Sequence, residues 1–418
     1  MKPDMYFITK DFPYGHVEDA FIGPEYPYLC DKYHVFVIAA ETDKSTKYEQ
    51  KGIEACVISS VQNTGDKLLS LMHFLCEKDC YIEIASIIRG REKILQRIYR
   101  ALMFGTAAET FYRRLKKKVG MNRDTNALFY FYWFDYKCFG LTMHKHKFPN
   151  IKIIARTHGY DLYDYRELYG KQFFKPQMDR GLERLIFAAQ YAKDYYLSRY
   201  GKQDGRKYPL YRLGVASQDM LVENRKDGYQ EEFLLLSCSN VISIKRVGLI
   251  IDALSYITEQ NIRWIHIGDG EQMDILKEEA FWKLDDKKNI QYEFTGYMRN
   301  DSVIDFYKEH YVSCFITTTS TEGGSPVSVQ EALSFGIPAI ATTVGELPQM
   351  VKDNGILVEE NPDVNEVKSA IEHMAEIYGT EEYFHMCEQS LKIYEDMFNA
   401  HNNYKALADE LGQLYAAG

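Results

Sequence analysis

Two glutamates and a pair of glycines stand close together within residues 319–338 of the 418-residue chain. Glu322, Gly323 and Gly324 follow an apolar, strand-like run, and Pro326 suits the first turn of a helix. Backbone N–H groups at the start of a helix lack partners within the helix, so they attract phosphate groups. We therefore expect a diphosphate site in this loop. Its candidate residues are Gly323, Gly324, Ser325, Pro326 and Val327.

Carboxylates on both sides of this helix start can bind hydroxyl groups. Glu331 lies within two turns of the loop, on the predicted helix, where its carboxylate can accept both hydroxyls of a ribose. Glu322, in the loop itself, can accept the hydroxyls of a sugar. The alternative interpretation is an ordinary strand–turn–helix connection with two solvent-facing glutamates.

A Lys-Arg pair marks the start of another predicted helix. Lys245 and Arg246 follow a strand-like run and a short polar loop. Positive charge is unfavourable at a helix N-terminus unless an anion binds there, which favours a diphosphate contact. A solvated pair of basic side chains is the alternative.

Two loops in the first half of the chain carry further candidates. His158 follows a strand-like run, and an imidazole in that position can donate to a hydroxyl or to developing negative charge. Gly15 lies in the loop after the first strand-like run, where the lack of a side chain permits a close backbone approach to a ligand.

Short apolar runs alternate with helical patterns along the whole chain, as is typical of βαβ units and parallel sheets. The predicted strands are Met5–Thr9, His34–Ala40, Ile53–Ser59, Ala127–Trp133, Ile151–Ala155, Leu185–Ala188, Leu210–Leu213, Phe233–Ser237, Arg263–Ile267, Ile290–Thr295, Ser313–Thr317, Ala339–Thr342 and Ile356–Val358. Helices are predicted between them, among others at Val247–Ile257, Glu271–Phe281 and Ser328–Phe335. The polar stretch Val222–Glu231 is predicted to be a linker, and Glu381–Leu414 to be helical throughout. The fold class is therefore α/β, with two doubly wound domains.

These motifs together resemble a known family. The segment that starts at Glu331 and continues Ala-Leu-Ser-Phe-Gly-Ile-Pro is similar to the hallmark of family 4 glycosyltransferases, in the capsular and exopolysaccharide branch of the retaining GT-B class. The family's two hallmark glutamates are separated by seven residues, whereas eight residues separate Glu322 from Glu331. Lys245 matches the family's phosphate-binding lysine. Asn240 stands where the family has a phosphate-binding arginine, and Arg246 is the candidate to replace it.

The other loops resemble the same family. Ala155–Tyr163 is similar to its Arg-x-His-Gly-x-Asp loop, which implies that His158 faces the donor sugar. The loop with Gly15 is similar to its acceptor-side loop. The turn with Gly268 and the turn at residues 294–297 resemble those that shape the pocket for the nucleotide base.

The resemblance implies a GT-B fold, with two Rossmann-like domains facing each other across a cleft. Residues 1–221 would form the acceptor-side domain, 222–385 the nucleotide-sugar-binding domain, and 386–418 C-terminal helices that pack back toward the first domain. It implies a hexosyltransferase that moves a sugar from a UDP-sugar or GDP-sugar to a glycan or lipid-linked acceptor in bacterial surface polysaccharide synthesis. In such enzymes the leaving phosphate activates the acceptor hydroxyl.

Two other functions remain open as alternatives. One is a GT-B nucleotide-sugar epimerase, and the other is a catalytically silent GT-B subunit that binds a partner transferase. An NAD-dependent dehydrogenase is disfavoured, because no G-x-G-x-x-G motif follows the first strand.

Composition narrows the remaining functions. The hydrophobic fraction of 46% fits a folded protein, and the net charge of −10 argues against nucleic-acid binding. The eight cysteines show no metal-ligand spacing, and no Asp-x-Asp motif stands at a strand end, so we expect neither a metal nor a cofactor. The chain opens without a signal-peptide pattern and has no apolar run of about 20 residues. These features predict a cytoplasmic protein.

The segment Arg89–Lys118 departs from the acidic trend. It carries ten basic residues and two acidic ones, a local charge of +8, interleaved with apolar residues at helical spacing. This pattern predicts an interfacial helix on an anionic membrane surface, at the inner face of the plasma membrane. A helix that packs its apolar stripe on the domain core is the alternative.

Overall fold

The computed structural model describes residues 2–15, 18–40, 52–59, 63–201 and 205–416. The chain divides into two compact units. Unit 1 contains Met1–Tyr211 together with Tyr404–Gly418, and unit 2 contains Arg212–Asn403. The chain therefore crosses between the units twice. This division places the first crossing ten residues before the predicted limit of the first domain, and it separates the last two helices.

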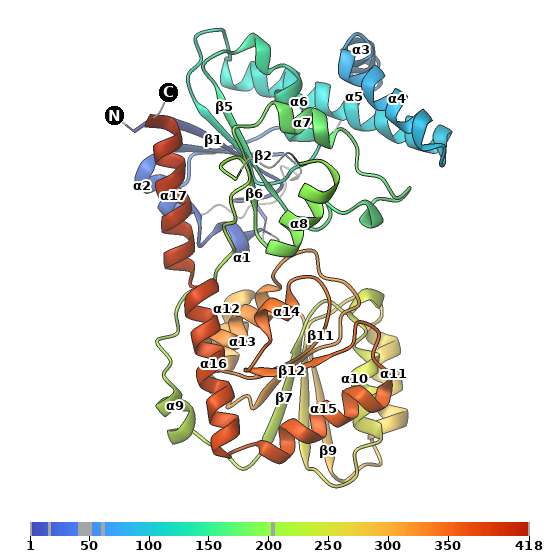
Figure 1. Ribbon diagram of the computed structural model, residues 1–418, viewed down its shortest axis with the longest axis vertical. Coiled ribbons are helices and arrows are strands. Elements are labelled where there is room, and N and C mark those ends of the chain that lie inside the picture. The colour runs from blue at the N-terminus through green and yellow to red at the C-terminus, as the bar shows by residue number, and fades with distance from the viewer. Residues whose placement is uncertain (1, 16–17, 41–51, 60–62, 202–204, 417–418) are drawn as a thin grey trace. The chain divides into compact units, whose positions relative to one another are not determined.

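Unit 1 is built on a parallel six-stranded sheet of order β3-β2-β1-β4-β5-β6 (Figure 1). Its strands are β1 (Asp4–Thr9), β2 (His34–Ala39), β3 (Ala55–Val57), β4 (Leu128–Phe131), β5 (Lys152–Thr157) and β6 (Arg184–Phe187). Its helices before the first crossing are α1 (Asp19–Ile22), α2 (Tyr26–Lys32), α3 (Thr64–Leu75), α4 (Lys78–Gly90), α5 (Ile94–Val119), α6 (Tyr136–Met143), η1 (Lys145–Lys147), η2 (Asp164–Arg166), α7 (Lys175–Arg180) and α8 (Gln190–Arg199).

Both faces of this sheet are buried, as its apolar strands require. Helices α3 to α8 cover one face, and α1, α2 and α17 (Ala400–Ala416) cover the other. Leu407 and Leu411 of α17 pack against Phe7 and its neighbours on the sheet. Lys32 pairs with Asp409 at 2.6 Å. The end of the chain is thus an integral part of unit 1.

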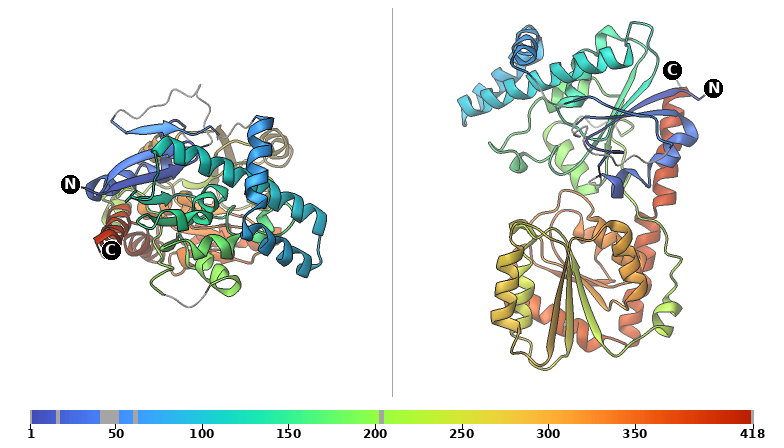
Figure 2. Two further views of the ribbon diagram at one scale, coloured as in Figure 1. Left: turned by 90° about the horizontal axis from the view of Figure 1, so that it is seen from above. Right: turned by 180° about the vertical axis from the view of Figure 1, so that it is seen from behind.

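Unit 2 repeats the same design, with a parallel six-stranded sheet of order β12-β11-β10-β7-β8-β9 (Figure 2). Its strands are β7 (Phe233–Cys238), β8 (Ile262–Ile267), β9 (Ile290–Gly296), β10 (Cys314–Thr317), β11 (Ala339–Thr342) and β12 (Gly355–Val358). Its helices are α9 (Val222–Asp227), η3 (Ser243–Lys245), α10 (Gly248–Ser255), α11 (Met273–Leu284), α12 (Asn300–Glu309), α13 (Val327–Ser334), α14 (Leu347–Met350), α15 (Val364–Ile377) and α16 (Glu381–Met397). Numbered from the first strand of each unit, both sheets have the order 3-2-1-4-5-6 of a doubly wound fold.

The predicted α/β fold class is confirmed, and three details of the prediction were wrong. Leu210–Leu213 is not a strand, because only Leu210 bridges to Phe187 at the edge of the sheet. The predicted linker contains the short helix α9, whose Arg225 is buried and donates to the carbonyl of Val312. The C-terminal segment is not one helix, since it breaks between α16 and α17.

Candidate active site

In each unit the two central strands of the sheet mark the point where the winding direction reverses, and ligands of doubly wound folds bind at the carboxyl ends of such strands. In unit 2 these strands are β7 and β10. The loop after β7 leads to Lys245 and Arg246, and the loop after β10 carries Glu322 and leads to Glu331. The topology therefore brings together the two motifs that the sequence places about 80 residues apart.

Polar side chains fasten these two loops to each other. The backbone N–H of Ser320 donates to the carbonyl of Ile244 at 2.8 Å, and the Thr319 hydroxyl donates to the same oxygen at 3.1 Å. The Thr318 hydroxyl donates to the carbonyl of Arg246 at 3.0 Å. The Thr-rich end of β10 thus fixes the position of the 3-10 turn that carries Lys245.

Lys245 and Glu322 form an ion pair between the two loops. The side chains are 20% and 11% exposed, so the pair is largely shielded from water. The sequence predicts that both residues contact the donor, one through its ammonium and the other through its carboxylate. The structure places them beside each other, each compensating the charge of its partner.

The guanidinium of Arg246 binds protein oxygens, whereas the sequence predicts that it contacts phosphate. Its guanidinium donates to the carbonyls of Thr318, Thr319 and Glu360 at 2.7, 2.9 and 2.8 Å, and to the side chain of Asn361. These bonds join the loops after β7, β10 and β12. Arg246 therefore positions the site through the backbone. Asn240, at the start of the same loop, is exposed.

Glu331 is buried in α13 with 3% of its surface exposed. The side-chain amide of Asn300, at the start of α12, donates to its carboxylate. Burial raises the pKa of Glu331 to about 7, although the Asn300 hydrogen bond works in the opposite direction. A carboxylate held this way favours a ligand whose hydroxyls donate to it. Sequence spacing gave no signal for Asn300.

The loop before α13 offers space and backbone amides. Pro326 caps the helix, whose first residue is Val327, and the side-chain amide of Gln330 donates to the carbonyl of Ser325 at 3.1 Å. A methyl group added at Gly324 would meet no described atom within 4 Å. The helix start that the sequence predicts is present, with open space beside one of its two glycines.

Two glycines elsewhere allow the loops to approach. Gly268 has φ +140°, and a Cβ there would lie 1.9 Å from the carbonyl oxygen of Ser239. Gly345 has φ +55°, and a Cβ there would lie 2.5 Å from the carbonyl oxygen of Glu322. Gly268 thus supports the loop after β7. Gly345, which the sequence analysis missed, supports the residue that carries the first carboxylate.

Unit 2 also contains a cavity of about 720 Å³. Its lining includes Thr295 near the end of β9, and Tyr297 and Arg299 after that strand, and it extends along β8, β9 and α12 toward His310. Arg299 immediately precedes Asn300, the partner of Glu331. Thr295 and Tyr297, of the turn predicted to shape a base pocket, therefore line a cavity, and Asn300, which contacts Glu331, follows a few residues later in the chain.

In unit 1, β1 and β4 are the central strands, and Glu18 organises the loop after β1. Its carboxylate accepts the backbone N–H groups of Lys10, Asp11 and Phe12, at 2.9, 2.8 and 3.0 Å, and the indole N–H of Trp133. Glu18 had no role predicted from the sequence. Its carboxylate fixes this loop and joins it to the end of β4. Gly15 lies in the same loop, its N–H donating to the carbonyl of Asp11 at 3.0 Å.

His158 lies at the end of β5, its ring 4.2 Å from the ring of Trp133 between centroids. Its Nε2 is 3.0 Å from the carbonyl oxygen of Tyr132. Because a carbonyl only accepts, Nε2 carries the proton. Removal from water and the charges of Arg156 and Lys10 lower the pKa of His158 to about 3. The ring is therefore neutral at physiological pH, with Nε2–H donating to the carbonyl of Tyr132 and Nδ1 left as a hydrogen-bond acceptor.

Asp161 and a buried ion pair fix the segment that carries His158. Asp161 accepts the backbone N–H groups of His158 and Phe134 at 2.6 and 2.7 Å, and burial raises its pKa to about 7. One strand position before Thr157, Arg156 donates to Glu25 at 2.6 Å, and both side chains are fully buried. These contacts are structural, and they hold the ends of β4 and β5 together.

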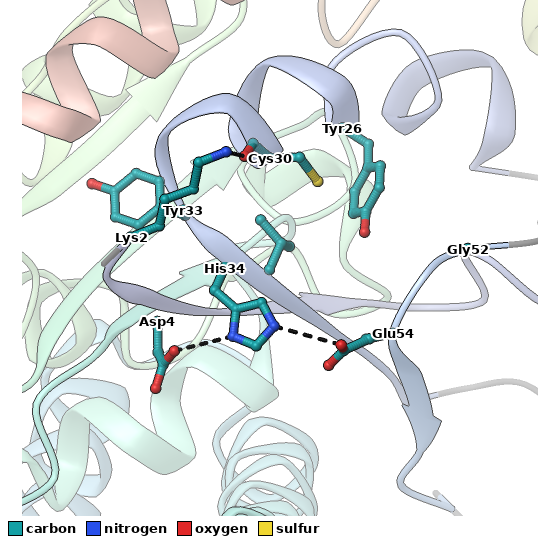
Figure 3. Close-up of a pocket in the computed structure, with 9 residues that line it drawn as sticks. Lys2, Asp4, Tyr26, Cys30, Tyr33, His34, Gly52 and Glu54 are labelled. Carbon is teal, nitrogen blue, oxygen red and sulfur yellow. Dashed lines mark hydrogen bonds and ion pairs between the residues drawn. The ribbon is translucent and has the colours of Figure 1, made fainter.

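A second cavity, of about 490 Å³, lies at the opposite end of this sheet (Figure 3). His34 lies between Asp4 and Glu54 there, at 3.3 and 3.5 Å. Asp4 and His34 are the first residues of β1 and β2, so this cavity is remote from the carboxyl ends of the strands.

Within the described ranges, no group of three or more His, Cys, Asp or Glu side chains is placed to hold a metal ion.

One family model matches part of unit 2. Residues 232–376 match the family model described as "Glycosyl transferases group 1". No curated protein sequence matches the chain.

Solved structures resemble the chain over nearly its full length. A glycosyltransferase from Rickettsia africae has a TM-score of 0.67 at 14% identity, with 99% of both chains covered. Anabaena HepE, in complex with UDP, has a TM-score of 0.64 at 15% identity, with 98% of this chain and 100% of HepE covered. A sucrose-phosphate synthase from Thermosynechococcus elongatus has a TM-score of 0.67 at 13% identity over the whole of both chains. At these identities the likeness establishes the fold, which is GT-B. The predicted fold is confirmed.

Proposed function

We propose that this chain, a glycosyltransferase of the GT-B fold with a group 1 domain in unit 2, is a retaining hexosyltransferase that uses a UDP-sugar or GDP-sugar. The observation that carries this proposal is the cluster of Lys245, Glu322 and buried Glu331 at the carboxyl ends of β7 and β10. HepE, which shares the fold, has been solved with UDP and with UDP-glucose.

The proposed donor contacts follow the chemistry of each group. Glu331 accepts the ribose hydroxyls, and the base lies toward Thr295 and Tyr297 in the cavity of unit 2. The amides of residues 323–327 and the ammonium of Lys245 bind the diphosphate. Glu322 accepts hydroxyls of the transferred sugar. Arg246 and Gly268 hold these loops in place. Asn240, at the exposed start of the loop after β7, also contributes to the donor site.

Donor binding rearranges one interaction. Without donor, Lys245 and Glu322 pair with each other. When the donor binds, the ammonium of Lys245 must pair with the diphosphate instead, and the carboxylate of Glu322 must accept a sugar hydroxyl. The leaving diphosphate then meets a cation and helix amides in a shielded site, where they stabilise the developing charge. On this proposal a phosphate oxygen removes the acceptor proton on the same face of the sugar.

In unit 1, Nδ1 of neutral His158 accepts a hydroxyl of the donor sugar, and the loop with Gly15 contacts the acceptor. The proposed acceptor is a glycan or lipid-linked saccharide in the synthesis of a bacterial surface polysaccharide. The proposed location is cytoplasmic, peripheral on the inner face of the plasma membrane. No described helix has the length and apolar character needed to cross a membrane.

A donor screen tests this function. Thermal stabilisation and slow hydrolysis of UDP-sugars and GDP-sugars identify the donor, and NMR of the early product gives its anomeric configuration. We expect retention, and we expect turnover to persist in a chelator. Inversion would exclude the retaining mechanism, and activity that a chelator abolishes and magnesium restores would exclude metal independence.

A further inference from the structure

The outer face of α3, α4 and the first half of α5 carries an unusual density of exposed apolar side chains. Ten of the 22 large hydrophobic residues that are exposed in the described chain lie within residues 68–103. They are Leu68, Leu69, Met72, Leu75, Tyr81, Ile82, Ile88, Leu95, Tyr99 and Met103. Patches of this kind on a folded protein mark an interaction surface.

These residues point outward because the opposite faces of the same helices are packed. On α3, Ser70 and Phe74 face α5, where a Cβ on Gly105 would lie 2.2 Å from the Phe74 ring. Leu68 and Met72 lie on the opposite side of α3, since two residues along a helix turn the side chain by about 200°.

Helix α5 shows the same division. Arg97 and Ala101 are buried, whereas Leu95, Tyr99 and Met103 form an exposed stripe at intervals of four. In Figure 1 the three helices form the blue-to-cyan corner of unit 1 that projects beyond the sheet.

The apolar stripe predicted over the whole basic segment is only partly exposed. Phe111, Tyr112 and Leu115 belong to the core of unit 1, as the alternative interpretation had it for this half of the helix. The exposed apolar surface comes instead from α3, α4 and the beginning of α5.

The basic residues also divide into two groups. Four of the ten hold the fold together. Arg97 donates to the carbonyl of Tyr169, Arg100 pairs with Glu167, Arg113 donates to Ser70, and Arg114 pairs with Asp66. The other six are Arg89, Arg91, Lys93, Lys116, Lys117 and Lys118.

The three basic residues of the α4–α5 corner adjoin the apolar face. Arg89, Arg91 and Lys93 are exposed, as are Lys67 on α3 and Lys78 on α4, and none of the five pairs with a carboxylate in the part of the chain that the structure describes. Lys116–Lys118 lie at the other end of α5, about 35 Å along the helix from Lys93.

Nearby acidic groups leave this surface positive. Asp79 and Glu83 of α4 are buried and bound to Arg180 and Lys171. Glu92, in the corner, pairs with Arg97.

We infer that the outer face of α3, α4 and the α4–α5 corner, here called the corner face, docks on an anionic lipid bilayer. Apolar side chains enter the interface while lysine and arginine head groups meet lipid phosphates, which is the arrangement that binds peripheral proteins to such surfaces. The buried Arg97 anchors the corner to the loop at Tyr169, so the basic side chains project from a fixed turn. The inference specifies a surface for the membrane location proposed above, and it can be tested without donor or transfer.

The test is co-sedimentation of the full chain with vesicles of phosphatidylglycerol and phosphatidylcholine, against vesicles of phosphatidylcholine alone. Arg89→Glu/Arg91→Glu/Lys93→Glu should weaken binding to the anionic vesicles by at least about tenfold. Lys116→Glu/Lys117→Glu/Lys118→Glu changes the net charge equally and should have an effect several times smaller. Equal losses in the two triple variants would overturn the assignment to the corner face.

A second pair of variants tests the apolar contribution. Leu68→Ser/Met72→Ser/Leu95→Ser should weaken binding to the anionic vesicles also at high salt. Ile275→Ser/Phe281→Ser/Trp282→Ser removes exposed apolar groups of α11 in unit 2 and should leave binding unchanged. All six positions changed in these two variants are exposed, so unchanged thermal unfolding is expected.

Other occupants of the corner face would give different results. A second copy of the chain would show as a dimer in light scattering that Leu68→Ser/Met72→Ser/Leu95→Ser dissolves, without vesicle binding by the parent protein. Transfer to a soluble saccharide with no vesicle binding would likewise overturn the inference, together with the proposed membrane location, while leaving the proposed transferase activity intact.

Discussion

The buried carboxylate of Glu331 links nucleotide binding to pH. Its pKa of about 7 means that the carboxylate is largely ionised only above that pH. Ribose hydroxyls donate to the ionised form, so affinity for the nucleoside of the identified donor, which has no phosphate to titrate, should fall as pH drops below 7. Glu331→Gln should weaken binding at pH 8 by about 1–3 kcal/mol and make it insensitive to pH. Calorimetry across pH 6–8 measures this, with Glu278→Gln on the exposed face of α11 as control. A pH-dependent affinity that persists in the Gln variant would remove Glu331 from the ribose.

The same substitution should stabilise the protein without ligand. The folded-state pKa of Glu331 lies above the ordinary value of 4.5, so the folded protein binds more protons than the unfolded chain between those two pH values. Stability therefore decreases as pH rises through this window, and the full cost is present above pH 7. Glu331→Gln should gain about 1–3 kcal/mol at pH 8 and little at pH 4.5. Chemical unfolding at both pH values checks this, and a loss of stability at pH 8 would contradict it.

Lys245 should discriminate between a diphosphate and a nucleoside. Lys245→Ala removes the ammonium and leaves Glu322 unpaired, so it should weaken UDP or GDP by at least about tenfold while the matching nucleoside binds as before. Lys277→Ala, at an exposed position of α11, is the control. Equal losses for nucleotide and nucleoside would place Lys245 away from the phosphates.

The neutral state of His158 leads to a prediction about turnover and its pH profile. With a pKa of about 3, it contributes no ionisation to the pH profile of turnover between pH 5 and 8. His158→Ala should lower turnover about 10- to 100-fold, the effect of one lost hydrogen bond near the reacting sugar, while nucleotide affinity stays unchanged. His385→Ala, on an exposed helix face, is the matched control. Wild-type turnover in His158→Ala would exclude it from the site.

Single residues were predictable where a motif specified both residue type and place. Lys245 and Glu322, predicted from two separate motifs, pair between the loops after β7 and β10, and Glu331 follows in α13, whereas their roles toward a donor stay predictions. The contact between Lys245 and Glu322 could not be foreseen, because it depends on the distance between two loops. Asn300 was missed for the same reason.

At the scale of elements, the approach of one loop to another depends on Gly345. Its φ of +55° disfavours other residues, and a Cβ would press on the carbonyl of Glu322. Gly345→Ala should displace the loop of Glu322 and reduce turnover more than it reduces stability, which should fall by about 1–2 kcal/mol. Gly65→Ala, in the first turn of α3 with its nearest atom at 3.5 Å, is the control. Turnover equal to that of the control variant would show that the loop is not held by Gly345.

Helices and strands with a clear hydrophobic pattern were predictable from the sequence. Elements whose structure depends on tertiary contacts were not. Buried parallel strands such as β7 and β10 appear in the sequence as apolar runs at the predicted places. Leu210–Leu213 is a shorter run, interrupted by Arg212, and lies at a sheet edge, where the structure describes one bridge, from Leu210 to Phe187. Helix α9 is polar, yet the burial of Arg225 against Val312 fixes it. Pattern alone carries no information about such partners.

At the scale of the molecule, residues 404–418 should matter to one unit and not to the other. A chain ending at Asn403 loses Leu407 and Leu411 from the sheet face, and also the Tyr33 hydrogen bond to the carbonyl of Leu411. Unit 1 should be destabilised by about 3–6 kcal/mol, the value of two buried leucines. Hydrogen exchange, resolved by unit, should show faster exchange in unit 1 and unchanged exchange in unit 2. The control Gln413→Ala changes an exposed position of the same helix, and uniform acceleration in both units would contradict the division.

The two crossings of the chain also set an order of events during synthesis. Unit 2 is continuous, so every residue it needs has been translated once Asn403 is made, whereas unit 1 waits for α17 although its six strands were finished by Phe187. Domains generally fold as units while the chain emerges from the ribosome. While all of unit 2 is translated, the face of the first sheet around Phe7 and Val37 therefore has only α1 and α2 to cover it, and α17 completes the cover after unit 2 has been made.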